Sequence, residues 1–262
     1  MLTTQEQLKY SRQIMLDKIG HSGQVSLRNA KILIVGVGGL GNPASLYLAA
    51  AGVGHLFLAD GDAIELSNLP RQIQFNEQDI DKNKADTAAD KLNQQFPDCH
   101  VEAIDDMLDQ ALCDYYLPQV DLVLDCSDNI TTRYLINQAC VTHKVPLVVG
   151  AATGFDGQQM VIDPRDDDSA CYHCLFPASE KAPANNCQTI GILGPVLAIV
   201  AGMQTLQAIK LLTDNKAQIN KLNLFDGLSN QWQHFTIKKQ KKCTVCRSEE
   251  RRVGKECRSR WS

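Results

Sequence analysis

The chain has 262 residues, of which 44% are hydrophobic and 21% charged, and its formal net charge is −4. This composition is typical of a globular protein with a sizeable core, and the acidic balance argues against general nucleic-acid binding. The first residues are polar and include no apolar stretch typical of a secretory signal, so we expect a cytoplasmic protein. In such a chain the ten cysteines indicate reduced thiols and a metal site rather than a disulfide scaffold.

The first half of the chain alternates short apolar strands with helices. Residues 5–29 are predicted to be helical, and the apolar residues 31–35 form a strand that runs into the glycine turn G-V-G-G-L-G. An Ala- and Leu-rich helix follows this turn, and a second strand ends at Asp60. Further strands are expected near 99–105, 120–128 and 145–151, and further helices over 82–97 and 131–144. This alternation predicts an α/β fold with a Rossmann-like, doubly wound and mostly parallel sheet.

The pattern changes after residue 150. Residues 154–174 are typical of antiparallel strand and loop, and residues 221–239 of a hairpin, so we expect an antiparallel C-terminal extension. The apolar run 194–212 is about as long as a membrane span, but its internal Gln204, Gln207 and Lys210 favour a buried helix. We expect a single domain over 1–246, with its nucleotide-binding part at about 28–150. Residues 247–262 switch to a basic, patternless composition, and we interpret them as a non-native tail.

The glycine turn indicates a nucleotide. Gly36, Gly38, Gly39 and Gly41 let the backbone approach a phosphate, and the following helix N-terminus favours an anion. Asp60 ends the next strand and is placed to accept hydrogen bonds from ribose hydroxyls. These features alone favour an NAD-binding unit, with a tight turn that binds no ligand as the alternative.

The residues after Asp60 favour ATP with Mg²⁺ instead. Asn68 and Arg71 follow closely, and Lys84 lies on the next helix. A triphosphate carries more charge than the pyrophosphate of a dinucleotide, and it needs Arg or Lys and a metal ion held by a carboxylate. Asp128 lies at the carboxyl edge of the predicted sheet, where ligands of open α/β sheets bind. Each residue alone is compatible with an ordinary surface charge, but together they indicate an Mg-ATP site.

Two C-x-x-C pairs lie far apart in the chain. Cys171 and Cys174 form one pair, and Cys243 and Cys246 form the other. Four cysteines favour a closed, tetrahedral and therefore structural zinc site. A redox pair is the alternative, but it requires a helix start, and C-Y-H-C-L-F-P is a poor one. Four further cysteines occur in apolar patterns and are expected to be buried and inert: Cys99, Cys113, Cys126 and Cys140.

The order of the motifs resembles the ThiF/MoeB/HesA family over about residues 7–246. The motifs are Y-S-R-Q-I, L-I-V-G-V-G-G-L-G, L-A-D-G-D-A-I-E-L-S-N-L-P-R-Q, L-D-C-S-D-N, C-Y-H-C-L-F-P, C-Q-T-I-G-I-L-G-P-V and C-T-V-C. Members of that family are adenylyltransferases for ubiquitin-like sulfur carrier proteins. The resemblance implies activation of the carrier's C-terminal glycine by ATP. It is closest to the ThiF branch, whose carrier is ThiS in thiamine biosynthesis; the alternative is MoaD in molybdenum cofactor biosynthesis.

The resemblance also implies roles for single residues at the nucleotide. The glycine turn binds ATP and Asp60 binds its ribose. Asn68, Arg71 and Lys84 contact the phosphates, and Asp128, beside Asn129, holds Mg²⁺. The family shows S-N-L-Q-R-Q where this chain has S-N-L-P-R-Q. Pro70 lacks an N–H, but we expect the loop to keep its shape because proline is tolerated in loops.

Two implied roles reach beyond the nucleotide. Arg12 matches an arginine that reaches the ATP of the partner subunit in a homodimer. Cys187 stands alone in a polar loop, where an incidental exposed thiol is the simplest interpretation. The resemblance instead implies that this cysteine attacks the acyl-adenylate or forms an acyl persulfide with the carrier, with sulfur from a donor enzyme.

The expected chemistry needs no general base, because the attacking carboxylate is already ionised. Positioning and charge neutralisation by Arg12, Arg71, Lys84 and Mg²⁺ then carry the reaction. Two other classes remain open at this point. An NAD-dependent oxidoreductase fits the glycine turn and Asp60 but leaves the basic residues and cysteine pairs unexplained. A non-catalytic, zinc-bound scaffold for a small partner fits if Pro70 has spoiled the ATP site.

Overall fold

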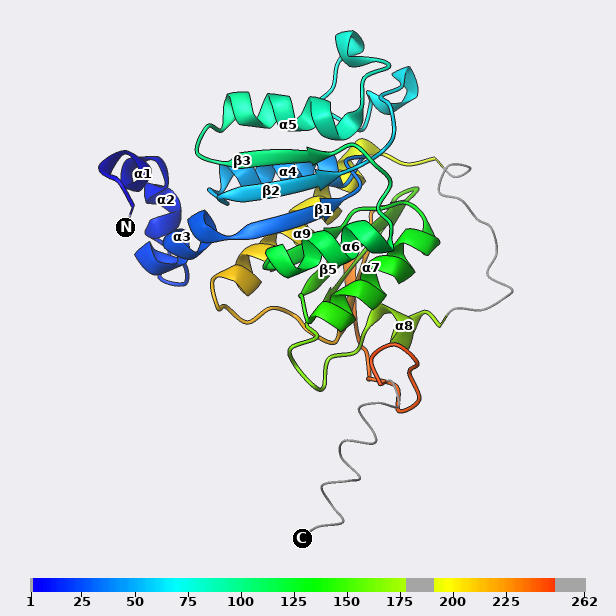
Figure 1. The fold of residues 1–262 in the computed structure, drawn as a ribbon. Coiled ribbons are helices and arrows are strands. Elements are labelled where there is room, and N and C mark those ends of the chain that lie inside the picture. Colours follow the sequence, from blue (N-terminus) through cyan, green and yellow to red (C-terminus); the bar gives the residue numbers. More distant parts are fainter. Residues whose placement is uncertain (1, 178–190, 248–262) are drawn as a thin grey trace.

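One sheet runs through the whole fold. The computed structural model describes residues 2–177 and 191–247, and its eight described strands are ordered β3-β2-β1-β4-β5-β6-β7-β8 (Figure 1). The strands are β1 (Lys31–Val35), β2 (His55–Ala59), β3 (His100–Ile104), β4 (Leu122–Asp125), β5 (Leu147–Thr153), β6 (Asp156–Ile162), β7 (Lys221–Asp226) and β8 (Gln231–Thr236).

The sheet changes direction at β5. Strands β3, β2, β1, β4 and β5 are parallel, and Leu33 of β1 lies opposite Phe57 on one side and Val123 on the other. Strands β5 to β8 are antiparallel, with Val149 opposite Met160. The predicted mostly parallel sheet with an antiparallel C-terminal extension is therefore confirmed.

Helices cover both faces of the sheet. Helices α4, α5 and α9 contribute to the core on one face, and α6, α7 and α8 to the core on the other (Figure 1). The α-helices are α1 (Thr4–Lys9), α2 (Ser11–Ile14), α3 (Gly20–Asn29), α4 (Gly41–Ala50), α5 (Lys84–Gln95), α6 (Gln110–Tyr116), α7 (Ile130–His143), α8 (Tyr172–Leu175) and α9 (Gly194–Leu212). Short 3₁₀ turns are η1 (Leu66–Asn68), η2 (Glu77–Asp79) and η3 (Leu117–Gln119).

Local signals explain the element boundaries. Strand β1 is a continuous apolar run because helices cover it on both faces. Helix α5 begins after Asn83, whose side chain accepts a hydrogen bond from the N–H of Asp86, and it ends before Pro97. Helix α6 was not predicted from the sequence. Its start is marked by Asp109, whose side chain caps the N–H of Leu112.

Helix α9 lies against the sheet and α4, and it is the one helix of residues 2–177 and 191–247 that is long and apolar enough to cross a membrane. Its two buried glutamines face inward and are hydrogen bonded. Gln204 donates to the carbonyls of Asp125 and Val148, at 2.9 and 3.3 Å, while Gln207 accepts from the N–H of Gln218. The helix packs on the sheet by one face, as expected for a core helix, but Ile199 and Leu206 on its other face are exposed. Gln204 joins β4 to β5 beside the site described next.

Candidate functional site

The glycine turn brings β1 and α4 close together after Val35. Gly36 has a φ of +87°, and a Cβ there would lie 2.8 Å from the carbonyl oxygen of Cys126. A Cβ at Gly41 would lie 1.8 Å from the oxygen of Gly36. Side chains are therefore excluded at both positions. The turn places Gly39 and Leu40 on the wall of a cavity at the carboxyl edge of the parallel strands.

Asp60 holds the turn in place. One of its carboxylate oxygens accepts a 2.7 Å hydrogen bond from the N–H of Val37, and the other accepts from the N–H of Asp62 at 3.0 Å. Burial raises the pKa of Asp60, and the positive charge of Lys84 and these two N–H groups oppose that rise. Asp60 is not among the residues that line the cavity. Its assignment to ribose binding stays a prediction.

The cavity has a volume of about 720 Å³, within the range of small-molecule sites. It brings together five residues predicted from the sequence, which come from separate segments: Gly39, Asn68, Arg71, Lys84 and Asp128. The remaining lining residues are Leu40, Asp62, Ala63, Glu65, Ser67, Gln72, Cys126, Ser127, Arg133, Ala151, Ala152, Gly191, Ile192 and Leu197.

Both predicted cations of the cavity are held by oxygen acceptors. Lys84 is buried, and its Nζ lies 2.7 Å from a carboxylate oxygen of Asp62. Arg71 donates from Nη1 to the carbonyl of Ser67 at 2.7 Å. A phosphate oxygen can take the place of either acceptor, because it offers a charge-assisted hydrogen bond to the same donors.

The loop that contains Pro70 folds as expected. Leu69 donates to the carbonyl of Leu66, and Arg71 donates to that of Asn68. In the same 3₁₀ pattern, the N–H of residue 70 would donate to the carbonyl of Ser67, but proline has no N–H. The guanidinium of Arg71 donates to that carbonyl instead. Pro70 therefore leaves the turn intact and gives Arg71 a local partner.

Arg133 is the main residue of the cavity that sequence reasoning missed. It is buried, and its Nη2 donates to the carbonyls of Ser127 and Gly150, at 2.6 and 3.0 Å. It thereby joins the segment after β4 to β5 at the wall of the cavity. The sequence did carry a signal, since Arg133, Ile136 and Cys140 are spaced for one helix face and all three are buried.

Other predicted residues lie outside the cavity lining. Arg12 is exposed on α2, near the amino end of the sheet, and Asn129 caps α7 by accepting from the N–H of Thr132 at 2.8 Å. Gly36, Gly38 and Gly41 shape the turn without lining the cavity. Cys187 and the expected non-native tail beyond Arg247 fall outside the described residues.

The two C-x-x-C pairs come together on the side of α7. The Sγ atoms of Cys171 and Cys174 are 3.9 Å apart, Cys171 lies 3.6 Å from Cys243, and Cys174 lies 3.5 Å from Cys246. Four sulfurs around a zinc ion, each at about 2.3 Å, would be about 3.8 Å apart. All four cysteines are buried, and the cluster could bind zinc.

Within the cluster the conditions favour a thiolate at Cys174, whereas hydrogen bonding with Cys174 raises the pKa of Cys171. Hydrogen bonding from Cys171 lowers the pKa of Cys174, and the N–H of Gln240 also donates to the sulfur of Cys174. One turn of helix, α8, does form directly after Cys171, so the expectation of a poor helix start was wrong there. The redox alternative is still not favoured, because each sulfur of this pair also contacts a sulfur of the distant pair.

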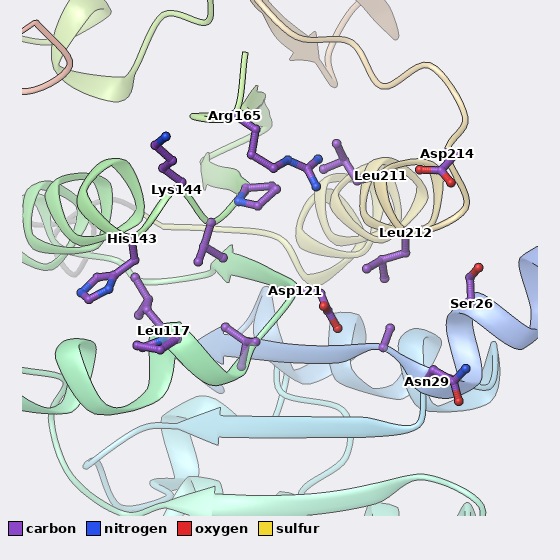
Figure 2. A pocket seen from close by; sticks show the side chains of 15 residues that line it. Ser26, Asn29, Leu117, Asp121, His143, Lys144, Arg165, Leu211, Leu212 and Asp214 are labelled. Atoms are coloured by element: carbon purple, nitrogen blue, oxygen red, sulfur yellow. The ribbon is translucent and has the colours of Figure 1, made fainter. Parts of the chain in front are cut away.

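A second cavity lies at the opposite, amino edge of the parallel strands, with a volume of about 590 Å³ (Figure 2). Lys144 and His143 lie on one side of it, Asp214 and Ser26 on the other, and Asp121 lies between them. Two of the groups that line it have local partners: Arg165 pairs with Asp163 at 2.7 Å, and His143 with Asp114 at 3.0 Å. None of the site residues predicted from the sequence lines this cavity.

Comparison with known proteins decides the family. The ThiF family model matches residues 10–245. The chain belongs to the ThiF family. It is 44% identical over 239 residues to the sulfur carrier protein ThiS adenylyltransferase of Escherichia coli (strain K12), covering 91% of this chain and 94% of that protein.

Other relatives are longer or more distant. The adenylyltransferase and sulfurtransferase MOCS3 of Culex quinquefasciatus is 40% identical over 250 residues, which is 94% of this chain and 56% of that protein. The chain thus spans about half the length of MOCS3. The crystal structure of E. coli MccB with MccA-N7isoASN has the same fold, with a TM-score of 0.80 at 24% identity, covering 91% of this chain and 75% of MccB. The ThiF-family relatives are adenylyltransferases, and this chain is an enzyme of that class.

Proposed function

We propose that this ThiF-family enzyme uses ATP and Mg²⁺ to adenylate the C-terminal glycine of a ubiquitin-like sulfur carrier of the ThiS type. The observation that carries the proposal is the cavity that collects Gly39, Asn68, Arg71, Lys84 and Asp128. The identity with a ThiS adenylyltransferase over 94% of that protein supports the choice of carrier. On this proposal residues 1–246 form one catalytic domain that works in the cytoplasm.

The proposed step transfers AMP to the carrier. A carboxylate oxygen of the carrier's glycine attacks the α-phosphorus of ATP, and the bond from that phosphorus to the bridging oxygen breaks. Pyrophosphate leaves with the electron pair of the broken bond. Arg71 and Lys84 neutralise the charge that develops on the phosphates, and Asn68 and Asp60 orient the nucleotide. Asp128 holds Mg²⁺, which supplies further charge stabilisation when bound.

A neighbouring cavity offers the carrier a route to the nucleotide. This cavity, of about 460 Å³, is lined by residues of β5, β6, β7 and β8 and shares Ala151 and Ala152 with the nucleotide cavity. Phe155 and Leu228 are exposed at adjacent turns at the same end of these strands. On this proposal the carrier packs on the antiparallel strands, and its glycine tail passes Ala151 to reach ATP.

The remaining proposed roles need partners. Arg12 acts on the ATP of a second copy, which requires a homodimer. Leu8, Met15 and Leu16 support an interface there, because all three are exposed apolar side chains close to Arg12 in the sequence. Cys187 forms the later covalent link to the carrier, and a sulfur-donor enzyme completes the transfer. The four cysteines hold a structural zinc ion.

MoaD is the second candidate carrier, because MOCS3 relatives are 40% identical to this chain. An oxidoreductase role has less support, since hydride transfer gives no task to Arg71, Lys84 and the four cysteines together.

The decisive experiment is carrier-dependent exchange of radiolabelled pyrophosphate into ATP. Purified ThiS and MoaD, each ending in Gly-Gly, are supplied separately. We expect exchange with ThiS, its loss in Asp128→Ala, and its retention in Asp90→Ala, which changes an exposed acid on α5. Exchange with MoaD alone would select the alternative carrier. Exchange with neither would refute the proposed activity.

A further inference from the structure

A second group of metal-ligating side chains lies far from the four cysteines, at the edge of the sheet. His55 and His100 begin the neighbouring strands β2 and β3 and are direct register partners. Glu102 follows two residues later on the edge strand. Because side chains of a strand repeat every second residue, all three point to the same face of the sheet, the face that carries α6.

The distances within this group suit a shared ion better than direct hydrogen bonds. Nε2 of His55 lies 3.6 Å from Oε2 of Glu102, and Nε2 of His100 lies 4.0 Å from the same oxygen. One ligand atom from each residue lies within 4.8 Å of the others. These separations exceed a normal hydrogen bond. Two ligands at about 2.1 Å from one tetrahedral ion would be about 3.4 Å apart, so small side-chain rotations suffice.

His55 is held ready for such an ion. Its ring stacks on Phe57 with centroids 4.1 Å apart and planes 21° apart, and it meets the ring of His100 edge-on at 4.6 Å. Its Nε2 is buried and accepts or donates no hydrogen bond within residues 2–177 and 191–247. A buried ring nitrogen whose nearest acceptor, Glu102, lies beyond hydrogen-bond distance is poorly satisfied. Protection of an edge strand by charge would explain His100 and Glu102, but not this nitrogen.

We propose that His55, His100 and Glu102 bind a divalent ion of borderline softness, with Zn²⁺ the best fit. Two imidazoles and one carboxylate form one of the common ligand sets of zinc sites. Mg²⁺, in contrast, prefers oxygen ligands alone. Three protein ligands leave at least one position for water. The site lies at the amino ends of β2 and β3, whereas the nucleotide cavity lies at the carboxyl edge, so the proposal does not depend on the proposed adenylation.

The test is a Zn²⁺ titration of the full chain, without a histidine tag and already loaded with zinc at the four cysteines. Bound metal is counted by mass spectrometry after removal of free ion, and affinity is measured by calorimetry. Wild type is expected to take up one further equivalent at micromolar Zn²⁺. His100→Ala and Glu102→Gln should weaken this uptake by at least about tenfold. Both residues are exposed, so these substitutions spare the core.

His143→Ala is the matched control, because His143 also pairs with a single acid, Asp114, but has no second imidazole beside it. It should leave the uptake unchanged. Zn²⁺ should also raise the melting temperature of wild type more than that of His100→Ala, because an ion that binds only the folded state stabilises it. The proposal is overturned if wild type takes up no further equivalent, if both variants bind as wild type does, or if His143→Ala loses the uptake equally.

Discussion

Lys84 and Asp62 form an ion pair within the nucleotide cavity, with 2.7 Å between Nζ and the carboxylate oxygen. The two partners differ in exposure: the Lys84 side chain is 9% exposed and that of Asp62 is 59% exposed. The ammonium is thus fixed, while the carboxylate can turn out to solvent. An incoming phosphate would displace the mobile partner and keep the lysine in place.

Lys84→Ala should therefore lower kcat/KM for adenylation by about a hundredfold, because a fixed charge that faces the leaving phosphates is lost. Lys82→Ala is the control, since Lys82 is exposed two residues away and does not line the cavity. Both are measured by carrier-dependent pyrophosphate exchange over a range of ATP concentrations. Equal rates for the two variants would contradict the role given to Lys84.

Arg133→Gln should destabilise the fold. The change removes the donor shared by the carbonyls of Ser127 and Gly150 in a buried site, at an expected cost of about 2 kcal/mol in the free energy of unfolding. Arg165→Gln breaks a half-exposed ion pair with Asp163 and should cost less than about 1 kcal/mol. Urea unfolding compares the two. A larger loss in Arg165→Gln would contradict the structural role of Arg133.

The order of strands and helices could be predicted because it depends on local periodicity and on the turn that follows each strand. Asp128 could be placed for a similar reason, because it follows β4, whose carboxyl end faces the site, and Lys84 because it begins the helix after β2. Contacts between distant segments could not be placed in this way. The burial of Arg133 depends on β5, whose Gly150 carbonyl accepts from it. The carboxylate of Asp60 accepts from the N–H groups of Val37 and Asp62, and these bonds depend on the exact path of the loops that follow β1 and β2.

Pro70→Gln should tighten ATP binding. A residue with an N–H at position 70 can donate to Ser67, which releases the Arg71 guanidinium for phosphate. Removing one competing hydrogen bond of about 1 kcal/mol corresponds to a KM for ATP lowered by about fivefold. Pro70→Ala also restores the N–H and should give the same gain. A KM that stays unchanged in both variants would show that Arg71 is not restrained by this carbonyl.

The acid stability of the loop before α5 should depend on Asp79. Burial opposes ionisation of Asp79, but hydrogen bonds from Lys91 and the N–H of Asn76 outweigh it and hold the pKa of the carboxyl below its ordinary value of 3.8. A lowered pKa in the folded state stabilises the fold above 3.8, and this contribution is lost as the pH falls through the folded pKa.

Asp79→Asn should therefore reduce the free energy of unfolding most at neutral pH, and its difference from wild type should shrink as the pH falls below about 4. Urea unfolding at a series of pH values measures that difference. Asp90→Asn, at an exposed position of α5, should show little difference at any pH. A difference for Asp79→Asn that stays constant with pH would mean that its ionisation adds nothing to stability.

The four-cysteine cluster should stabilise the C-terminal segment in particular, because it joins Cys171 and Cys174, beside α7, to Cys243 and Cys246, which follow β8. Cys246→Ser should abolish zinc binding at the cluster and lower the melting temperature. Hydrogen exchange should rise around residues 237–247 and α8, while β1 and β4 stay protected by the core.

Cys99→Ala is the control for zinc binding. Burial raises the pKa of Cys99 to about 12, so this thiol is a poor metal ligand. The zinc content of the Cys99→Ala protein should therefore match that of wild type. A zinc-free Cys246→Ser protein that melts and exchanges like wild type would show that the cluster does not hold this segment.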